Sequence, residues 1–441
     1  MCGILAVALK LNASLMVMAF RGWQALAGAF TLILSISFLT PEELGLFQTM
    51  TSVVAFFMIL DVGLSTVLVQ LSAARFNGAC WDGVIVGSGA VGREYLSLCK
   101  FAFIWYAVVG VLFMGVLPAG LVFFCEEAQL LFVDWIGPWA MLVIASALQM
   151  VLMPVLSVLE GAGQIFEVYA IRLLQVVVGA VAVWGVLLFG GNLWAVAMLP
   201  TGSVVVCVFW VIVRRWAFIV QVLKADAVSA ATWVADVWPL QWRAAFGWLA
   251  GYSLVLIHVP ILFVTQGAIA AGQMGVTMTV VNVLSVLAMS YPVAKVPSMV
   301  MLSSRQDWRA VDELFSRVWR ISIGMYLLGA LIVLLLMLVL QGWPVSARFL
   351  ALEQTALLLL GMAAYHMASV FGIFIRAHLQ DPLFKVAIGC AILTAILSYW
   401  ASRYWGSLGN IFVILAVNGG GFLPLTFVVL RKMRGSRLLL R

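Results

Sequence analysis

The sequence predicts an all-α integral membrane protein with about twelve transmembrane helices. Of its 441 residues, 65% are hydrophobic and 9% are charged, whereas a soluble protein of this size carries roughly 25% charged residues. The mean hydropathy is +1.16. Apolar runs of about 20 residues, the length that crosses the hydrocarbon core of a bilayer, recur along the chain between short polar segments. Lipid is therefore the solvent for most of this chain.

Twelve spans account for these apolar runs. They are expected at about residues 13–38, 46–72, 97–124, 135–158, 167–189, 193–213, 244–265, 273–302, 321–340, 355–376, 385–401 and 408–430. The first run is too long for the apolar part of a secretory signal and no small-residue cleavage site follows it, so we expect it to be retained as a helix. The eighth contains Pro292 and Pro297, which predict a kink.

The distribution of Lys and Arg predicts the orientation of the spans. If the N-terminus is cytoplasmic, the inner loops and tails contain 19 of the 24 basic residues, and the outer loops contain only Arg348 and Arg403. Cytoplasmic loops of membrane proteins carry such an excess, so both termini are expected in the cytoplasm. The net charge of +7 is then a consequence of topology, and no nucleic-acid partner is expected.

The longest inner connection, residues 214–242, divides the chain into an N-terminal half (1–213) and a C-terminal half (243–441), each with six spans. The segment 45–52 is similar to the segment 272–279, and each opens the second span of its half. An even number of spans per half predicts parallel repeats. Residues 304–320 have an apolar face opposite a charged face, which is typical of a helix lying on the cytoplasmic surface of the membrane; the alternative, which we favour, is a helical linker without a function of its own.

Three basic residues lie inside spans, all in the cytoplasmic third: Arg21, Arg172 and Lys295. Charge at such depth is costly and usually functional, here as a cationic, inward-facing cavity that holds an anion. The alternative is that these long side chains reach back to the inner headgroups. We favour the cavity for Arg21 and Lys295, which are deeper, and the headgroups for Arg172.

Asp61 is the only acidic residue deep in a span, at a depth comparable to that of Arg21. Because an unpaired carboxylate in lipid takes up a proton, we favour an Arg21–Asp61 ion pair, with proton coupling as the alternative. His258 precedes Pro260 in span seven; we favour a hydrogen-bonded packing residue, with a protonation site as the alternative. Trp248 and Tyr252 lie deeper in the same span and are candidates to stack on a sugar ring.

Several kinds of site are not expected. The six cysteines are scattered and the three histidines are not at metal-ligand spacing, so neither a disulfide framework nor a metal site is predicted. The sequence has no nucleotide-binding Walker motif, and we expect no cofactor. The outer loops are short and leave no room for a soluble catalytic domain, so the sequence does not predict an enzyme.

Residues Leu39–Gln70 contain two motifs, a Pro-Glu-Glu-hydrophobic-Gly turn after the first span and a hydrophobic-Asp-x-Gly-Leu-Ser stretch that closes the second. This region resembles the Wzx-type polysaccharide flippases of the multidrug/oligosaccharidyl-lipid/polysaccharide exporter superfamily. The likeness covers about thirty residues; beyond them only the span count, the orientation and the two-half layout agree. The residues that carry it are Pro41, Glu42, Glu43, Gly45, Asp61, Gly63, Leu64 and Ser65.

The resemblance implies a twelve-helix, two-lobed transporter that works by alternating access to a central cavity in the bacterial inner membrane. It implies export of an undecaprenyl-diphosphate-linked oligosaccharide from the cytoplasmic to the outer leaflet, for surface polysaccharide biosynthesis. The implied partners are this lipid-linked glycan, membrane lipid and other polysaccharide assembly proteins. With only three basic residues inside spans, such a cavity is modestly charged.

The main alternative is a cation-coupled multidrug exporter of the same superfamily. A site for cationic drugs favours carboxylates, whereas span one offers Arg21 and no acid. A sugar polymerase or ligase of the same pathways would carry a large outer loop, which is missing here. A passive membrane scaffold would have no use for charge inside its spans.

Overall fold

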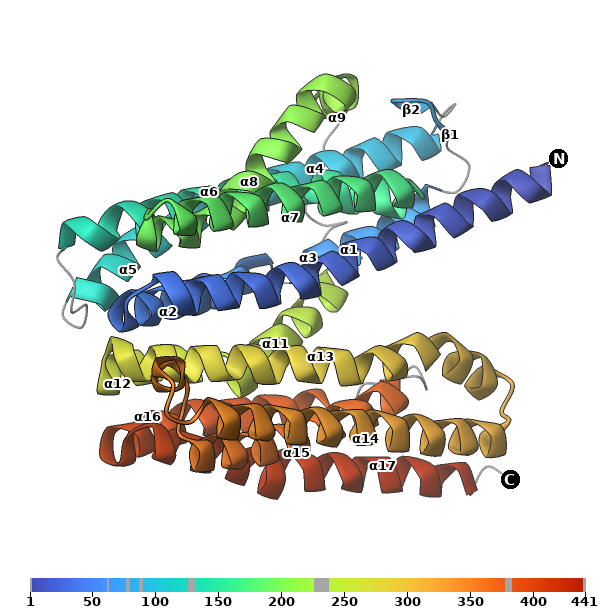
Figure 1. Cartoon of the computed structure of the whole chain (residues 1–441). Helices are drawn as coiled ribbons and strands as arrows, with labels where there is room; N and C mark the ends of the chain where they lie inside the picture. Colours follow the sequence, from blue (N-terminus) through green and yellow to red (C-terminus); the bar gives the residue numbers. More distant parts are fainter. Residues whose placement is uncertain are drawn as a thin grey trace. The chain divides into compact units, whose positions relative to one another are not determined.

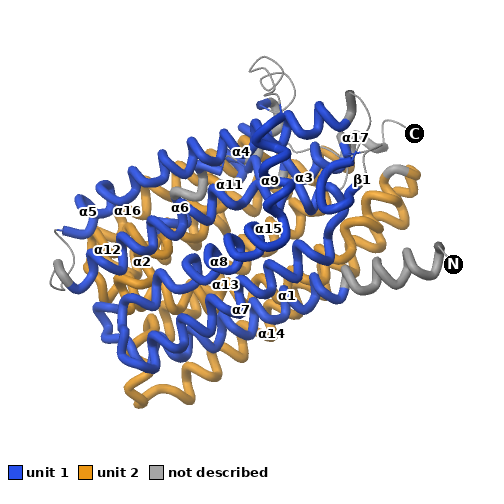
Figure 2. Tube along the Cα trace, turned by 90° about the horizontal axis from the view of Figure 1, so that it is seen from above, with its two compact units in different colours: residues 1–43, 53–248 blue, residues 44–52, 249–441 orange. Residues whose placement is uncertain are grey.

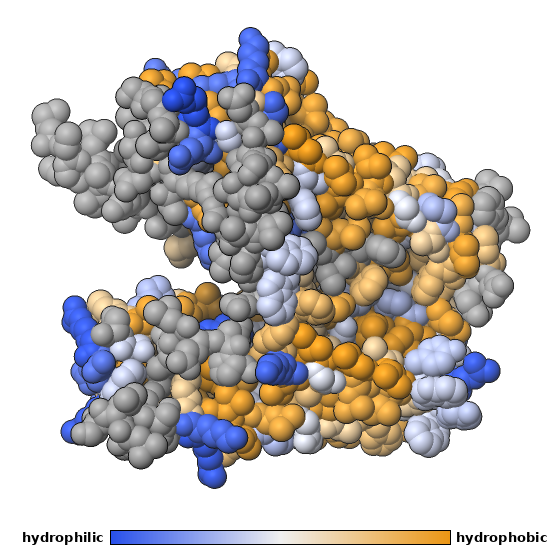
Figure 3. All heavy atoms as spheres, turned by 180° about the vertical axis from the view of Figure 1, so that it is seen from behind, coloured by the Kyte–Doolittle hydropathy of each residue, from blue (hydrophilic) through white to orange (hydrophobic). Residues whose placement is uncertain are grey.

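The computed structural model describes residues 2–61, 63–76, 80–86, 90–125, 132–225, 238–376 and 383–438. These residues are almost entirely helical, which confirms the predicted fold class. Among them, nine helices are long and apolar enough to cross a membrane, or ten if the bent pair at Ala245–Val255 and His258–Gln266 forms one span. Hydrophobic side chains cover most of the helix surfaces, and hydrophilic side chains gather towards the helix ends (Figure 3).

All twelve expected segments are helical, and two local breaks account for the lower count. The second segment is interrupted between α2 (Pro41–Phe57) and α3 (Leu64–Arg75), so no single helix there is long enough. The last two segments run together as one, from Phe384 to Arg434. Asp61 and Gly63 lie at the first break, and Gly406 lies at the second.

Gly406 separates the last two segments. It has φ 58° and ψ −143°, a conformation outside the helical region. A Cβ added to Gly409 would lie 2.3 Å from the carbonyl oxygen of Ala401, although eight residues span about 12 Å in a straight helix. Asn410 Nδ2 also donates to Ser402 Oγ at 2.9 Å. The chain therefore folds back at Gly406.

The chain forms two compact units (Figure 2). Unit 1 comprises residues 1–43 and 53–248. Its elements are α1 (Cys2–Phe38), the two ends of α2, η1 (Met58–Asp61), α3, β1 (Cys80–Trp81), β2 (Ile85–Val86), α4 (Ala90–Phe113), α5 (Val116–Cys125), α6 (Phe132–Gly161), α7 (Ile165–Leu188), η2 (Asn192–Trp194), α8 (Ala195–Trp210), the π-helical η3 (Val211–Arg215), α9 (Trp216–Lys224) and the start of α11 (Trp238–Val255). The expected connection, residues 214–242, thus includes α9, and its residues 226–237 lie outside the described part of the chain.

Unit 2 comprises residues 44–52 and 249–441. Besides the middle of α2 and the end of α11, its elements are α12 (His258–Gln266), α13 (Ala268–Ser304), α14 (Trp308–Leu340), η4 (Pro344–Arg348), α15 (Leu352–Arg376), α16 (Phe384–Leu415), the π-helical η5 (Ala416–Phe422) and α17 (Leu423–Leu438). Within this unit α13, α14 and α15 pack on one another, and α12 packs on α13 and α16 (Figure 1).

The start of α2 shows what the turn motif does. The Thr40 N–H donates to Glu43 Oε2 at 2.9 Å, and the Glu43 N–H donates to Thr40 Oγ1 at 3.2 Å. This reciprocal pair is a capping box, with Pro41 at the first helical position, where its missing N–H is harmless. The motif residues therefore begin a helix.

The two similar segments contact each other inside unit 2. A Cβ added to Gly45 would lie 1.9 Å from the carbonyl oxygen of Ala268, and one added to Gly275 would lie 2.7 Å from Cβ of Gln48. Small residues let helix backbones approach this closely in membranes. One glycine from each segment, Gly45 and Gly275, thus lets α2 and α13 pack closely.

In unit 1 the same device joins α7 and α8, which pack along each other. A Cβ on Gly179 would lie 2.9 Å from the carbonyl oxygen of Leu199, and a Cβ on Gly202 would lie 2.7 Å from Cα of Gly179. The backbones are in contact, so neither position has room for a side chain. This contact fixes the spacing of two helices that line the cavity described below.

Residues 304–320 do not form a separate surface helix. α14 runs without a break from Trp308 to Leu340, and its first turns are part of the same rod as the ninth span (Figure 1). The apolar face packs on protein: Val311, Phe315 and Val318 are buried, and the Phe315 ring lies 4.2 Å from that of Phe374. An amphipathic pattern predicts a buried face, and here α15 and α17 cover it instead of lipid.

Candidate functional site

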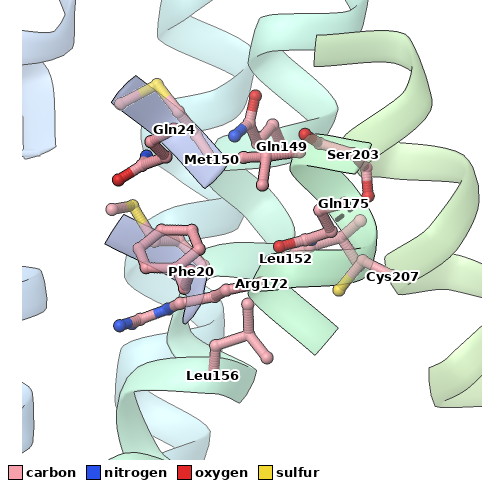
Figure 4. Close-up of a pocket in the computed structure, with 12 residues that line it drawn as sticks. Phe20, Gln24, Gln149, Met150, Leu152, Leu156, Arg172, Gln175, Ser203 and Cys207 are labelled. Carbon is pink, nitrogen blue, oxygen red and sulfur yellow. Dashed lines mark hydrogen bonds between the residues drawn. The ribbon is translucent and has the colours of Figure 1, made fainter. Parts of the chain in front are cut away.

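A cavity of about 220 Å³ lies inside unit 1, between α1, α6, α7 and α8 (Figure 4). We call it the amide pocket, because three glutamine side chains line it. Its lining residues are Phe20, Gln24, Gln149, Met150, Leu152, Met153, Leu156, Arg172, Gln175, Val176, Ser203 and Cys207. Polar side chains in the middle of membrane helices are uncommon and usually functional.

Much of the hydrogen-bonding capacity of the amide pocket is unused. Gln175 Nε2 donates to the carbonyl oxygen of Ser203 at 3.2 Å, which ties α7 to α8 (Figure 4). Gln24 and Gln149 form no hydrogen bond with another described residue. Each of these two amides offers two donors and a carbonyl acceptor. The pocket is therefore equipped to bind a polar, uncharged group.

Arg172 reaches the amide pocket but is already paired. Its Nη2 lies 2.8 Å from Glu160 Oε2, and Glu160 also accepts a hydrogen bond from the Tyr169 hydroxyl at 3.2 Å. The guanidinium lies 5.0 Å from the Tyr169 ring, and the Phe20 ring packs edge-on against the same tyrosine. Arg172 therefore does not present an unpaired charge to the pocket.

Arg21 lies one turn before Gln24 on α1 and is exposed. Its guanidinium is 5.8 Å from the Phe20 ring, and within the described residues it forms no ion pair. Unlike Arg172, it keeps its full charge and its five N–H donors for a ligand.

Lys295 is half-buried on α13, between Pro292 and Pro297. Its Nζ lies 5.7 Å from the ring of Tyr291, and it too forms no ion pair within the described residues. α13 is one continuous helix that includes both prolines, so the chain does not leave the helix where the kink was predicted. Each unit thus contains one unpaired cation among the residues expected to bind an anion.

The expected Arg21–Asp61 ion pair is not formed. Asp61 Oδ1 accepts a hydrogen bond from the Tyr106 hydroxyl, and Oδ2 accepts one from Ser65 Oγ at 2.8 Å. Asp61 ends η1, and Gly63 adopts a left-handed conformation with φ 66° before α3 begins. The carboxylate therefore holds the interruption of the second span together, since it binds a donor on α3 and one on α4. The prediction rested on the similar depths of Arg21 and Asp61 in the membrane, and depth does not determine the direction in which a side chain points.

Tyr252 is 8% exposed, and its hydroxyl donates to the carbonyl oxygen of Ser52 at 3.0 Å. In this conformation it packs α11 against α2 and offers no open face to a sugar. The Trp248 side chain lies outside the described part of the structure. The stacking role of Trp248 stays a prediction, because it falls outside the described side chains.

His258 is fully buried at the start of α12, with Nδ1 3.4 Å from Ser398 Oγ on α16. The side chain of the buried Asn410 on α16 also forms a hydrogen bond with His258. These contacts are those of a packing residue that links α12 to the helical hairpin at Gly406. Among the described residues, no group of three or more His, Cys, Asp or Glu side chains could hold a metal ion.

The three glutamines of the amide pocket were not predicted as site residues, because a neutral amide stands out less than a charge in an apolar span. Gln149 and Gln175 are each the only Gln in their span, and the span of Gln149 contains no charged residue. Neutral amides at such positions are a usable signal, because burying one without a partner costs roughly 1–3 kcal/mol in proteins.

No protein-family model matches the sequence, and no curated protein sequence does. Solved structures do match. A lipid II flippase, MurJ, in an inward closed conformation has a TM-score of 0.68 and 11% identity, over 94% of this chain and 87% of that one. An inward-facing multidrug resistance MATE transporter has a TM-score of 0.64 and 13% identity, over 94% and 95% of the two chains.

A third match is a MOP superfamily transporter from Pyrococcus furiosus, described as having a binding pocket of reversed polarity, with a TM-score of 0.57 and 14% identity over 96% of both chains. At these identities the likeness concerns the fold. The chain has the same all-helical, two-lobed fold as these structures, two of which are described as transporters of the MOP superfamily.

Proposed function

We propose that this protein is a transporter that moves a polyprenyl-diphosphate-linked oligosaccharide from the cytoplasmic to the outer leaflet of a bacterial inner membrane. The observation that carries the proposal is the structural match with a lipid II flippase, which extends over nearly the whole chain. Lipid II flippases move a lipid-linked sugar, and the motifs near the start of this chain resemble flippases for polysaccharide precursors.

Two unpaired cations, Arg21 and Lys295, are the groups that we expect to bind the diphosphate. A diphosphate carries about two negative charges, which cannot enter hydrocarbon unassisted. Arg21 and Lys295 are unpaired within the described residues. Both lie in the part of their spans that we assign to the cytoplasmic side, where such lipids are made. Arg21 would bind two phosphate oxygens with its planar fork, and Lys295 would add a point charge.

Alternating access completes the proposed cycle. The two halves, residues 1–213 and 243–441, would rock about the connection at 214–242 and open the site to each side in turn. Both termini would remain cytoplasmic, as the 19 basic residues of the inner segments predict. The polyprenyl tail would stay in the membrane while only the headgroup passes through the protein.

A cation-coupled multidrug exporter is the second candidate, and the match with MATE transporters favours it. The amide pocket does not favour this candidate, because its described lining residues include an arginine and no carboxylate. The carboxylate of Asp61 is engaged by Tyr106 and Ser65. A cationic drug would find no counter-ion in this pocket.

Depletion of the protein in the producing cell tests the proposal. If it is a flippase, lipid-linked glycan accumulates in the cytoplasmic leaflet and surface polysaccharide falls, because synthesis continues while export stops. The glycan's leaflet can be read with a membrane-impermeant glycosidase before and after lysis of spheroplasts. Unchanged glycan distribution together with increased sensitivity to cationic drugs would favour the multidrug exporter instead.

A further inference from the structure

The amide pocket is electrically balanced. Among the described lining residues only Arg172 is charged; it is held by Glu160 at 2.8 Å, and that glutamate is bound a second time by Tyr169. No acidic residue is among the described residues that line the pocket. A second anion placed here would have to compete with Glu160 for the guanidinium, in surroundings where an unpaired charge is strongly disfavoured. The pocket is therefore unsuited to the diphosphate.

The remaining polar groups suit hydroxyl groups. Gln24 on α1 and Gln149 on α6 form no hydrogen bond with any described residue, and Gln175 uses only its Nε2. A sugar hydroxyl donates one hydrogen bond and accepts others, and a side-chain amide offers both a carbonyl acceptor and N–H donors. The Phe20 ring and the Met150 and Met153 side chains supply apolar surface for the C–H face of a ring.

We propose that the amide pocket binds one uncharged sugar ring, such as a hexose or an N-acetylhexosamine, and discriminates against uronic acids. This inference rests on the proposed function and adds the chemical class of the sugar to it. The volume of about 220 Å³ matches one ring better than a chain of several. Arg21, one turn before Gln24 on α1, would hold the phosphates, so the sugar in the pocket would be one close to the diphosphate.

Binding of free sugars to the purified protein tests this. The protein is placed in phospholipid nanodiscs, because glycoside detergents would occupy the pocket. The probes are the methyl glycosides of N-acetylglucosamine, galactose and glucuronic acid, detected by saturation-transfer difference NMR. We expect at least one neutral probe to bind and the glucuronide to give no signal.

The test variants are Gln24→Leu and Gln149→Leu, separately and together. Neither amide has a hydrogen bond to lose within the described residues, so the fold should survive. The double variant should bind the neutral probe about tenfold more weakly, as expected for the loss of two hydrogen bonds. The matched control is Gln70→Leu, an exposed glutamine on α3 outside the pocket, which should leave binding unchanged.

Three outcomes would overturn the inference: binding that is equal in wild type and double variant, a glucuronide signal as strong as that of the neutral probes, or no neutral-probe signal from the wild type. Leaflet accumulation after depletion is measured separately. If depletion makes lipid-linked glycan accumulate in the cytoplasmic leaflet and any of these three outcomes is also seen, the sugar pocket is wrong and the flippase proposal stands.

Discussion

Arg21→Gln and Lys295→Gln should each abolish surface polysaccharide while the protein remains folded and inserted. Each change removes a cation that forms no ion pair within the described residues, so no internal partner is left uncompensated. The lost charge would otherwise offset part of the diphosphate's charge during passage. Arg21→Lys should keep partial function, because the charge stays while the planar fork is lost. Polysaccharide is quantified on cells matched for the amount of membrane-inserted protein.

Arg309→Gln is the matched control, since Arg309 is exposed on the polar face of α14 and is paired only with Glu313 on the same helix. A surface pair of this kind contributes little, so export should be normal. If Arg21→Gln and Lys295→Gln both export normally, capture of the diphosphate by these residues is wrong. Cation exchange linked to Asp61 would then become the leading mechanism.

Gly179→Leu should destabilise the protein by about 2–3 kcal/mol, the usual cost of forcing extra side-chain volume into a packed contact. A Cβ at this position already lies within 3.1 Å of Cα and 2.9 Å of the carbonyl oxygen of Leu199, and backbone atoms cannot rotate away. α7 and α8 would have to separate, which would also open the amide pocket between them. Thermal unfolding of the purified protein measures the loss.

Gly185→Leu on the same helix is the control. A Cβ at Gly185 has no neighbour within 4 Å, so this variant should unfold close to the wild-type temperature. Both substitutions remove a glycine from α7 and add the same side chain, so helix propensity cancels between them. Equal stability of the two variants would contradict the close α7–α8 contact.

The architecture was predictable because lipid imposes a simple rule on sequence. A helix that crosses the bilayer must be apolar for about 20 residues, and this requirement marks each segment without reference to its neighbours. Details that depend on a neighbour were harder to predict. The apolar face of residues 304–320 was identified, but the sequence could not say whether membrane or α15 and α17 would cover it.

The candidate site divides in the same way. Arg21 and Lys295 stood out because a charge in an apolar span is visible in the sequence itself. The partner of Asp61 did not, because Tyr106 lies 45 residues away on another helix. Gly63 after Asp61 was a usable sign of the interruption, since glycine favours the left-handed conformation found there. The three glutamines of the amide pocket come together only when α1, α6 and α7 pack, and no single span shows that.

The most direct test of the proposed function is translocation by the purified protein alone. Protein and a polyprenyl-diphosphate-linked glycan are reconstituted into phospholipid vesicles, and an impermeant glycosidase outside removes the glycan it can reach. In protein-free vesicles only the outer-leaflet fraction should be cleaved. The wild-type protein should make nearly all of the glycan accessible, and the Arg21→Gln, Lys295→Gln double variant should behave like protein-free vesicles. Wild-type vesicles in which the inner-leaflet glycan stays protected would contradict a flippase.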